Sequence, residues 1–316
     1  MKSYRIKLNF NSPLHIGVKE NEFNTISKII HSDTLFSAII NAYNLLYGLK
    51  KTKEFLDYVV NNEDSLGISS AFFYYKDIYF YPRPLGFNFG LVEKGLDYKK
   101  IKKIEYVSEE YIKGDVKEPL VLGKFALDGD KKFYEKELVF IEERPRISKD
   151  RITNETNIFN MSYLRLLNQS GYWFYLNVDE SIKDEVFSAL RLLSDEGIGG
   201  ERTYGCGFFD FEVTEVEPVK INEGNVYLLL SNFYPKEAPE FEKAISYKFY
   251  ERTGFPYSIY GVNAREPLLR FISEGSVFNS KVNGKILDIT PEDFRVHKIY
   301  KYGRAYLIPI KKEAQD

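Results

Sequence analysis

The sequence contains little cysteine, little histidine and no long apolar run. Its 316 residues include one cysteine, Cys206, and three histidines, His15, His31 and His297. A single cysteine excludes an internal disulfide framework, and scattered histidines provide no structural zinc spacing, so we expect no metal and no cofactor. The N-terminus lacks the apolar core of a signal peptide, and no segment approaches the ~20 apolar residues of a membrane-spanning helix. These absences predict a cytoplasmic protein without membrane association.

An excess of charge of one sign is also lacking. The formal net charge is -2 at pH 7, which argues against a uniformly basic surface that would coat nucleic acid. A polyanion site would therefore be a local patch, and acidic faces would remain for protein partners. With 44% hydrophobic and 28% charged residues, the chain is predicted to be globular and long enough for two domains. Aromatic residues make up 16%, of which most fit packed sheets and a minority would stack on bases.

Familiar nucleotide-binding glycine motifs are absent as well. Five glycines occur among residues 197–207, within the stretch SDEGIGGERTYGCGFFDFE. A dinucleotide fingerprint counted from Gly197 meets Arg202 in place of its third glycine, and a P-loop counted from Gly200 meets Cys206 in place of its lysine. Apolar residues at helical spacing precede the loop and an aromatic strand follows it, which is the wrong order for both motifs.

A strand and a capped helix are predicted near the start of the chain. Residues 4–12 alternate apolar and polar side chains, the period of a strand with one buried face. The segment HSDTLFSAIINAYNLLYG carries an apolar stripe at helical spacing, with Ser32 or Asp33 placed as N-cap and Gly48 placed to end the helix. A second helix is predicted at residues 52–60.

The clear elements together predict an α+β fold. Their order is β-α-β…β-α-β, the ferredoxin-like order also used by RNA-recognition sheets. Weak periodicity predicts a long insertion at about 86–170, and residues 218–224 are predicted to form a boundary before a mostly β region. We therefore expect a domain at 1–217 and a smaller one at 218–316. The remaining predicted elements are a hairpin at 69–81 turning near Lys76 and Asp77, a strand at 171–178, a helix at 181–193 and strands at 207–217 and from 225.

The glycine-rich loop is the first candidate for ligand binding. Glycines allow backbone amides to approach a phosphate closely and to adopt positive φ, while Arg202 adds a charge and Tyr204 a stacking surface. The alternative is an unusually tight helix-to-strand turn, but five glycines exceed what a turn requires, so ligand binding is favoured. The glycines concerned are Gly197, Gly199, Gly200, Gly205 and Gly207.

The basic segment RPRISKDR is the best linear candidate for contact with an RNA backbone. Its arginines, Arg144, Arg146 and Arg151, have forked guanidinium groups that match phosphate geometry. A solvated or partner-facing loop explains the same composition equally well.

His31 is the most attractive catalytic candidate, because it precedes a helix whose N-terminus attracts phosphate. A nuclease would use it as a general acid or base. The interpretation that it only organises the helix start is favoured, since the sequence reveals no partner for it. His15, between Pro13 and Gly17, is interpreted as a loop-packing residue, and Cys206, between two glycines, as a small structural residue.

Several segments together resemble one known family. They are SPLHIG, IHSDTLFSAI, PRISKDRITNETNIFNMSYLRL, SDEGIGGERTYGCGFF, FISEGSVF and VHKIYKYGRAYLIPI, and they span almost the whole chain. They resemble the RAMP proteins of CRISPR–Cas systems and, within them, the fourth Csm subunit of type III-A effector complexes. The helix segment and the last two segments are more specific than the glycine loop, which all RAMP groups share.

This resemblance implies a fold, a function and partners. The fold would be two ferredoxin-like domains of the RNA-recognition type, with a thumb-like insertion that contains the three arginines. The protein would be a non-catalytic subunit in antiviral defence, without obligate homo-oligomers, that holds the repeat-derived 5′ tag of the guide RNA. It would contact the large polymerase-like subunit and the backbone RAMP subunit. The glycines and Arg202 would form the tag-binding loop, and Ser32, Asp33 and Thr34, at the neighbouring helix start, would belong to the same RNA-binding site.

Two alternatives remain open from the residues. One is a guide-processing RAMP endoribonuclease that uses His31 or His15, and it requires the purified protein to cut repeat RNA. The other is a scaffold that meets RNA only through its partners, and it requires that Arg202→Ala leave RNA crosslinking unchanged.

Overall fold

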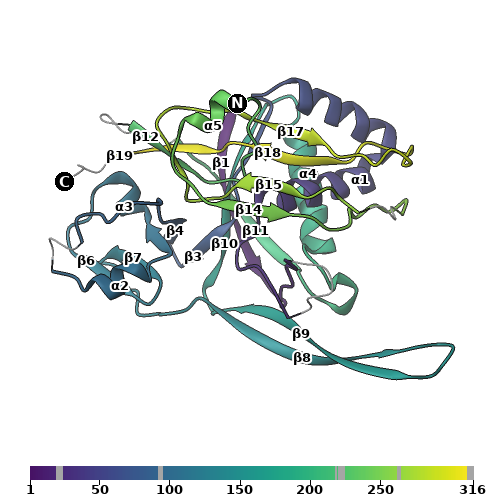
Figure 1. Ribbon diagram of the computed structural model, residues 1–316, viewed down its shortest axis with the longest axis horizontal. Helices are drawn as coiled ribbons and strands as arrows, with labels where there is room; N and C mark the ends of the chain where they lie inside the picture. The colour runs from purple at the N-terminus through teal and green to yellow at the C-terminus, as the bar shows by residue number, and fades with distance from the viewer. Residues whose placement is uncertain (19–23, 92–94, 218, 220–224, 262–264, 312–316) are drawn as a thin grey trace.

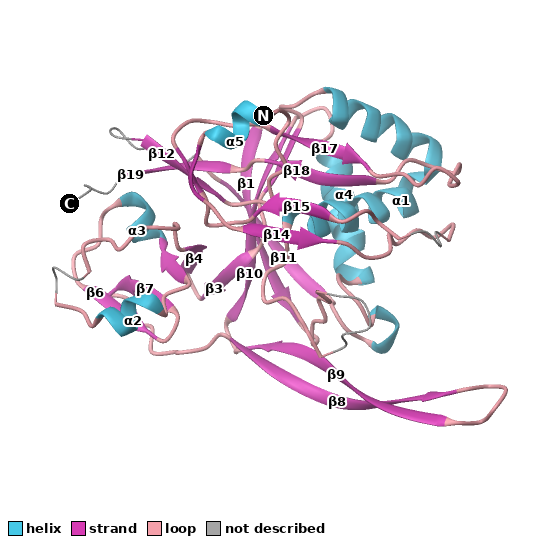
Figure 2. Ribbon diagram, in the orientation of Figure 1, coloured by secondary structure: helices cyan, strands magenta, loops and turns pink. Residues whose placement is uncertain are grey.

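The computed structural model describes residues 1–316 except 19–23, 92–94, 218, 220–224, 262–264 and 312–316. It is an α+β molecule in which strands predominate (Figure 2). Most of the boundary predicted at 218–224 lies outside the described residues.

Nine strands form the main sheet. Eight follow the order β11-β1-β10-β3-β4-β5-β7-β6, and β2 pairs with β10. The pairings are antiparallel except that of β5 with β7, which is parallel. The bounds are β1 (Lys2–Phe10), β2 (Leu66–Ile68), β3 (Phe72–Tyr75), β4 (Ile78–Pro82), β5 (Tyr106–Ser108), β6 (Pro119–Leu122), β7 (Phe125–Asp128), β10 (Ser170–Val178) and β11 (Phe209–Glu215).

Two helices, α1 (Ser32–Asn61) and α4 (Lys183–Glu196), pack side by side against one face of this sheet (Figure 1). Alternate residues of β1 point toward them, as the period-two pattern predicts, and Ile6 and Leu8 are buried there. The Tyr43 hydroxyl on α1 donates a 2.6 Å hydrogen bond to the Glu185 carboxylate on α4. Each fully buried Leu, Ile or Phe side chain stabilises such a core by about 1.5–3 kcal/mol relative to exposure.

The central strand β10 is buried on both faces. Tyr172 and Phe174 join the core beneath α1 and α4, whereas Trp173 and Tyr175 join a second core on the opposite face. That second core includes apolar residues of β12 and β19 from the C-terminal region. The uninterrupted aromatic run of the predicted strand at 171–178 reflects this double burial.

Helix α1 departs from its predicted limits at both ends. Gly48 has φ 77° and ψ 170°, so it kinks the helix, which then continues through the second predicted helix to Asn61. The N-cap position is His31, with the Thr34 N–H donating to the His31 carbonyl at 3.0 Å. The predicted N-cap role of Ser32 or Asp33 is therefore wrong. Both are helical residues whose side chains bond to the C-terminal region instead.

The region predicted as an insertion contains two kinds of structure. Helices α2 (Tyr98–Lys102) and α3 (Glu109–Lys113) accompany the strands that extend the main sheet beyond β4. The chain then forms the antiparallel hairpin of β8 (Val139–Lys149) and β9 (Thr156–Leu166), which projects from the body (Figure 1). Residues 147–158 at its tip are all exposed, so burial imposes no apolar alternation there.

The C-terminal region is mostly β, as predicted. A four-stranded sheet has the order β13-β16-β12-β19, and two further strand pairs, β14–β15 and β17–β18, flank it. The bounds are β12 (Asn225–Leu229), α5 (Ala238–Glu242), β13 (Ala244–Ser246), β14 (Phe249–Arg252), β15 (Leu269–Ile272), β16 (Val277–Phe278), β17 (Gly284–Asp288), β18 (Tyr300–Arg304) and β19 (Leu307–Lys311).

Candidate functional site

The glycine-rich loop at residues 197–207 connects α4 to β11 and contains one 3-10 turn, Arg202–Tyr204. It docks on the segment that follows β1. The Gly200 N–H donates to the His15 carbonyl and the Gly207 N–H to the Pro13 carbonyl, each at 2.8 Å. The loop and the segment SPLHIG, which are far apart in the sequence, therefore form one surface.

Most of the glycines are required by packing within the protein. A Cβ at Gly199 would overlap the His15 carbonyl oxygen, and one at Gly207 would overlap the Ile198 carbonyl oxygen. A Cβ at Gly197 would lie 3.0 Å from the Cys206 carbonyl oxygen, and a Cβ at Gly200 would lie 2.9 Å from His15 Cδ2.

Gly205 differs from the other loop glycines. Its φ is +82°, yet a Cβ there would meet no atom within 4 Å. Gly205 therefore belongs to the open side of the loop, with the exposed residues Thr203 and Tyr204.

Arg146, on the hairpin strand β8, joins this open side to the hairpin. Its guanidinium lies 4.1 Å from the centre of the Tyr204 ring, and Tyr204 is 67% exposed. It also forms a 2.8 Å ion pair with Glu201 and donates a 2.9 Å hydrogen bond to the Tyr163 hydroxyl. That hydrogen bond raises the pKa of the Arg146 guanidinium, which remains charged at every relevant pH.

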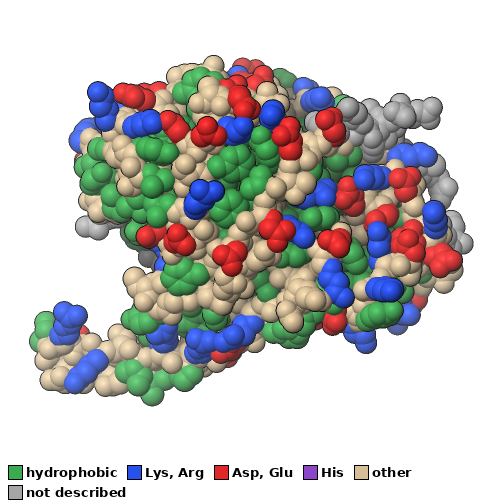
Figure 3. Space-filling view, turned by 180° about the vertical axis from the view of Figure 1, so that it is seen from behind, with side chains coloured by type: hydrophobic (Ala, Val, Ile, Leu, Met, Phe, Trp, Pro, Cys, Tyr) green, Lys and Arg blue, Asp and Glu red, His purple; other side chains and the backbone are tan. Residues whose placement is uncertain are grey.

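The other predicted arginines take different positions. Arg144 lies 5.0 Å from the centre of the Tyr163 ring and pairs with Glu142 at 2.7 Å, so it belongs to the same surface as Arg146. Arg151 lies in the turn at the hairpin tip, away from the loop (Figure 1). Arg202 lies 4.9 Å from the centre of the Tyr257 ring, in the C-terminal region. Basic side chains gather at the tip and near the base of the hairpin in Figure 3.

Ser32, Asp33 and Thr34 bind the C-terminal region. Ser32 Oγ accepts a 3.0 Å hydrogen bond from the Asn232 N–H, and Asp33 Oδ1 accepts one of 3.2 Å from Asn232 Nδ2. Arg252 Nη2 donates to Thr34 Oγ1 at 2.8 Å, and Arg252 Nε lies 3.0 Å from Asp33 Oδ2. Ser32 and Asp33 are at most 1% exposed, so their side chains hold the two regions together.

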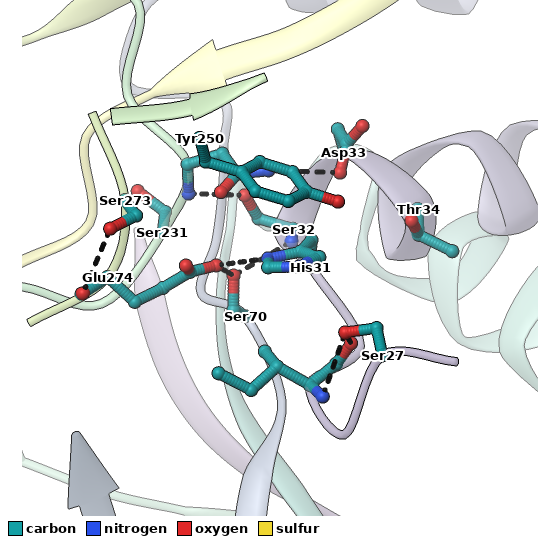
Figure 4. A network of polar contacts seen from close by, with 12 residues as sticks. Ser27, His31, Ser32, Asp33, Thr34, Ser70, Ser231, Tyr250, Ser273 and Glu274 are labelled. Atoms are coloured by element: carbon teal, nitrogen blue, oxygen red, sulfur yellow. Dashed lines mark hydrogen bonds and ion pairs between the residues drawn. The ribbon is translucent and has the colours of Figure 1, made fainter. Parts of the chain in front are cut away.

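His31 belongs to the same network (Figure 4). Its Nδ1 lies 2.8 Å from Glu274 Oε1, and its ring stacks on Tyr250 with 4.3 Å between the ring centres. Ser70 Oγ donates to the same Glu274 oxygen. Since the His31 side chain is only 7% exposed, these contacts describe a structural histidine.

His15, in the segment after β1, and Cys206, within the glycine-rich loop, both contact β9. His15 Nδ1 is 2.8 Å from the Ser162 carbonyl oxygen, which ties the segment after β1 to β9. Cys206 packs with Met161 and Tyr163, and burial raises the pKa of its thiol. A raised thiol pKa disfavours the thiolate, so Cys206 is poorly suited to act as a nucleophile.

Comparison with known proteins identifies the family. A sequence model of the RAMP superfamily matches residues 7–210, more than half of the chain. The chain belongs to the RAMP superfamily. A second model, described as the CRISPR Csm4 C-terminal domain, matches residues 222–310.

Two relatives of this RAMP protein, both described as CRISPR system Cms protein Csm4, match along nearly their whole length. The Methanocaldococcus jannaschii protein is 25% identical, over 100% of this chain and 99% of the relative. The Thermococcus onnurineus protein is 28% identical, over 95% of this chain and 98% of the relative. The predicted resemblance to the fourth Csm subunit is thereby confirmed.

Solved structures share the fold of this RAMP protein. A chain in a Csm3–Csm4 subcomplex of the type III-A CRISPR–Cas interference complex has a TM-score of 0.69 and 21% identity, covering 99% of this chain and 100% of that one. A chain in a Csm1–Csm4 cassette with AMPPNP has a TM-score of 0.62 and 19% identity, and both chains are covered completely.

The sequence did not reveal which residues face the start of α1. Arg252, Glu266, Glu274 and Lys301 come from more than 200 positions further along the chain, and no local pattern marks them. Glu274 lies within FISEGSVF, a segment typical of the family, but its bond to His31 depends on the tertiary fold. Lys301 is 7% exposed and lies 2.7 Å from Glu266 and 3.9 Å from Asp33.

Two classes of feature are absent from the part of this RAMP protein that the structure describes. No group of three or more His, Cys, Asp or Glu side chains is arranged to hold a metal ion. No described helix is long and apolar enough to cross a membrane.

The buried carboxylate of Asp33 makes stability depend on acid pH. Burial alone raises its pKa, but the positive charges of Arg252 and Lys301 outweigh burial and hold the pKa below its ordinary value of 3.8. A depressed folded-state pKa contributes stability that is complete above the unfolded value and is lost as pH falls through the folded value. When the pH is lowered below about 4, we expect the melting temperature of the protein to decrease. Asp33→Asn should weaken this dependence when melting temperatures are measured from pH 7 to pH 3. If the melting temperature of the variant changed with pH as steeply as that of the wild type, Asp33 would not be the cause.

Proposed function

We propose that this protein is a non-catalytic, cytoplasmic RNA-binding subunit of the Csm4 type in a type III-A CRISPR complex for antiviral defence. It would hold the repeat-derived 5′ tag of the guide RNA. The observation that carries the proposal is the contact of Arg146 with Tyr204, which joins the glycine-rich loop and the hairpin strand β8 in one exposed basic and aromatic surface. Guanidinium groups bind phosphates bidentately, and exposed aromatic rings stack on unpaired bases.

The predicted site residues would divide into two roles. Arg144, Arg146, Arg202 and Tyr204 would contact the RNA, with the open backbone at Gly205 between them. The remaining loop glycines would shape the loop, while the buried residues Ser32 and Asp33 would position the neighbouring helix without touching RNA, and Thr34 would lie half-buried at the helix start. Arg151 would reach a different stretch of RNA from the hairpin tip.

The finer fold assignment is also a proposal. A ferredoxin-like domain at 1–217 is supported by the order β1-α1-β3…β10-α4-β11 and by the strand order β11-β1-β10-β3. The smaller domain would occupy 218–316 and would also be ferredoxin-like. The projecting hairpin would be the thumb-like part of the insertion at 86–170.

Protein partners follow from the complexes named for the solved neighbours. The subunit would link a large polymerase-like subunit, as in the Csm1–Csm4 cassette, to a backbone RAMP subunit, as in the Csm3–Csm4 subcomplex. Exposed apolar side chains suit such contacts: Ile245 of β13, Tyr247 of the connection and Phe249 of β14 are 53%, 44% and 49% exposed.

A non-catalytic role is supported by the surroundings of the two candidate histidines. His31 is enclosed by Glu274 and Tyr250, and His15 bonds to the Ser162 carbonyl behind the loop. The purified protein is expected to leave repeat RNA intact. Cleavage that is lost in His31→Ala or His15→Ala would contradict this part of the proposal.

The arginine surface can be tested by salt-dependent binding. In complexes assembled from purified subunits, Arg146→Gln and Arg144→Gln should each weaken guide RNA binding about tenfold. Each should also lower the slope of log affinity against log salt by about 0.7, as expected for one lost phosphate contact on a single strand. Arg191→Gln is the matched control, since Arg191 is exposed on α4 and forms no ion pair among the described residues. Equal affinities for all three variants would favour a scaffold that meets RNA only through its partners.

A further inference from the structure

A large groove lies between α1 and the C-terminal region, beside the surface described above. Its volume is about 990 Å³. One wall is α1, and the other is formed by residues 255–259 and 290–301. The floor carries the ion pairs of Arg252 with Asp33 and of Lys301 with Glu266, so the buried charges there are already neutralised.

The C-terminal wall presents rings and apolar side chains. Phe255 and Tyr257 are 50% and 61% exposed, and Ile259 is 48% exposed. Further along, the rings of Phe294 and His297 pack edge to face with 4.8 Å between their centres. Exposed aromatic faces in a groove bind unstacked bases in a sequence-tolerant way, at about 1–3 kcal/mol per base.

The α1 wall presents hydrogen-bonding groups. Thr34, Ser37, Asn41 and Asn44 recur at intervals of three or four residues, which places them in one row on the helix, and all four line the groove. Asn41 Nδ2 donates to the Ser37 backbone carbonyl, and this bond does not use the side-chain oxygen of Asn41, which is an acceptor. Asn44 Oδ1 accepts from Thr52 Oγ1 at 3.4 Å, which leaves the Asn44 amino group as a donor.

Basic side chains stand on both rims. Lys50 and Lys53 follow the kink of α1, Arg295 lies on the opposite rim, and all three are exposed. None of the three forms an ion pair with another described residue, although Asp57 and Glu292 also line the groove. Unpaired cations beside aromatic rings are the combination that binds single-stranded nucleic acid.

The groove adjoins the glycine-rich loop. Arg202 of the loop lies 4.9 Å from the centre of the Tyr257 ring, and Tyr257 lines the groove. We propose that the groove receives unstacked nucleotides of the same RNA strand that the loop holds, with bases against Phe255 and Tyr257 and phosphates at the rims. This inference rests on the proposed function and extends its site across the C-terminal region.

The test uses the assembled complex, with 4-thiouridine placed at successive positions of the guide and crosslinked peptides identified by mass spectrometry. We expect particular tag positions to crosslink to residues 255–259 or 290–301. Phe255→Ala should reduce those crosslinks about fivefold or more and leave the crosslinks to residues 197–207 unchanged. Tyr134→Ala is the control, because Tyr134 is an 80% exposed ring outside the groove, and it should change neither set.

The other outcomes separate the two proposals. Crosslinks to residues 197–207 with none in the groove would overturn the inference and leave the proposed function standing. The absence of guide crosslinks anywhere on this chain would overturn both. Protein crosslinks from residues 255–259 to another subunit, without RNA crosslinks, would make the groove a protein interface and would also overturn the inference.

Discussion

Asp33→Ala is expected to destabilise the protein by about 3–5 kcal/mol, the usual cost of removing one partner from a buried ion pair. Asp33 is 1% exposed and faces the cations Arg252 and Lys301. Without the carboxylate, Arg252 would keep its buried charge uncompensated, and Asn232 Nδ2 would lose its acceptor. Because these contacts join α1 to the C-terminal strands, the loss should affect the whole molecule.

The measurement is the free energy of unfolding in urea, with Asp57→Ala as the matched control. Asp57 lies on the same helix, is exposed and forms no ion pair with another described residue, so its replacement should change stability by no more than about 0.5 kcal/mol. Similar, small effects for the two variants would show that the Asp33 cluster does not hold the two regions together.

Gly207→Ala should be far more destabilising than Gly205→Ala. Both glycines have φ +82°, so alanine costs about 1–2 kcal/mol at either position through its backbone conformation. At Gly207 the new Cβ would also overlap the Ile198 carbonyl oxygen, whereas at Gly205 it would meet open space. Crowding of this kind adds about 1–3 kcal/mol or more.

The difference between the melting temperatures of the two glycine variants measures the effect of crowding alone, because the backbone cost is common to both. Gly207→Ala should also weaken guide binding, since Gly207 anchors the loop to Pro13 through its N–H. Equal melting temperatures would mean that the loop can move away from the segment SPLHIG at little cost, and the packing explanation of the glycines would be wrong.

Periodicity predicted the elements whose burial is regular. The alternation in β1 and the apolar stripe of α1 appear in the structure because each buries one face against the main core. The hairpin predicted at 69–81 appears as well, with side chains buried in the cores on both faces of the sheet. The helix start was misassigned, because Ser32 and Asp33 suit an N-cap locally but find stronger partners in Asn232 and Arg252.

The candidate site was predictable in its parts and not in its arrangement. The motifs singled out Arg144, Arg146 and Tyr204, and the fold brings these three together. Glycine content alone could not separate Gly205, on the open side of the loop, from the glycines that pack inside. That distinction depends on residues 13–16, which pair with the loop only in the folded chain.

The most direct test of the central claim maps the contacts between guide RNA and this chain in the assembled complex, by ultraviolet crosslinking and sequencing at nucleotide resolution. The account predicts that crosslinked nucleotides lie in the repeat-derived 5′ tag and that Arg146→Gln reduces them. Crosslinks confined to the rest of the guide, or a heterogeneous set of 5′ ends with no repeat-derived tag in the bound RNA, would contradict it.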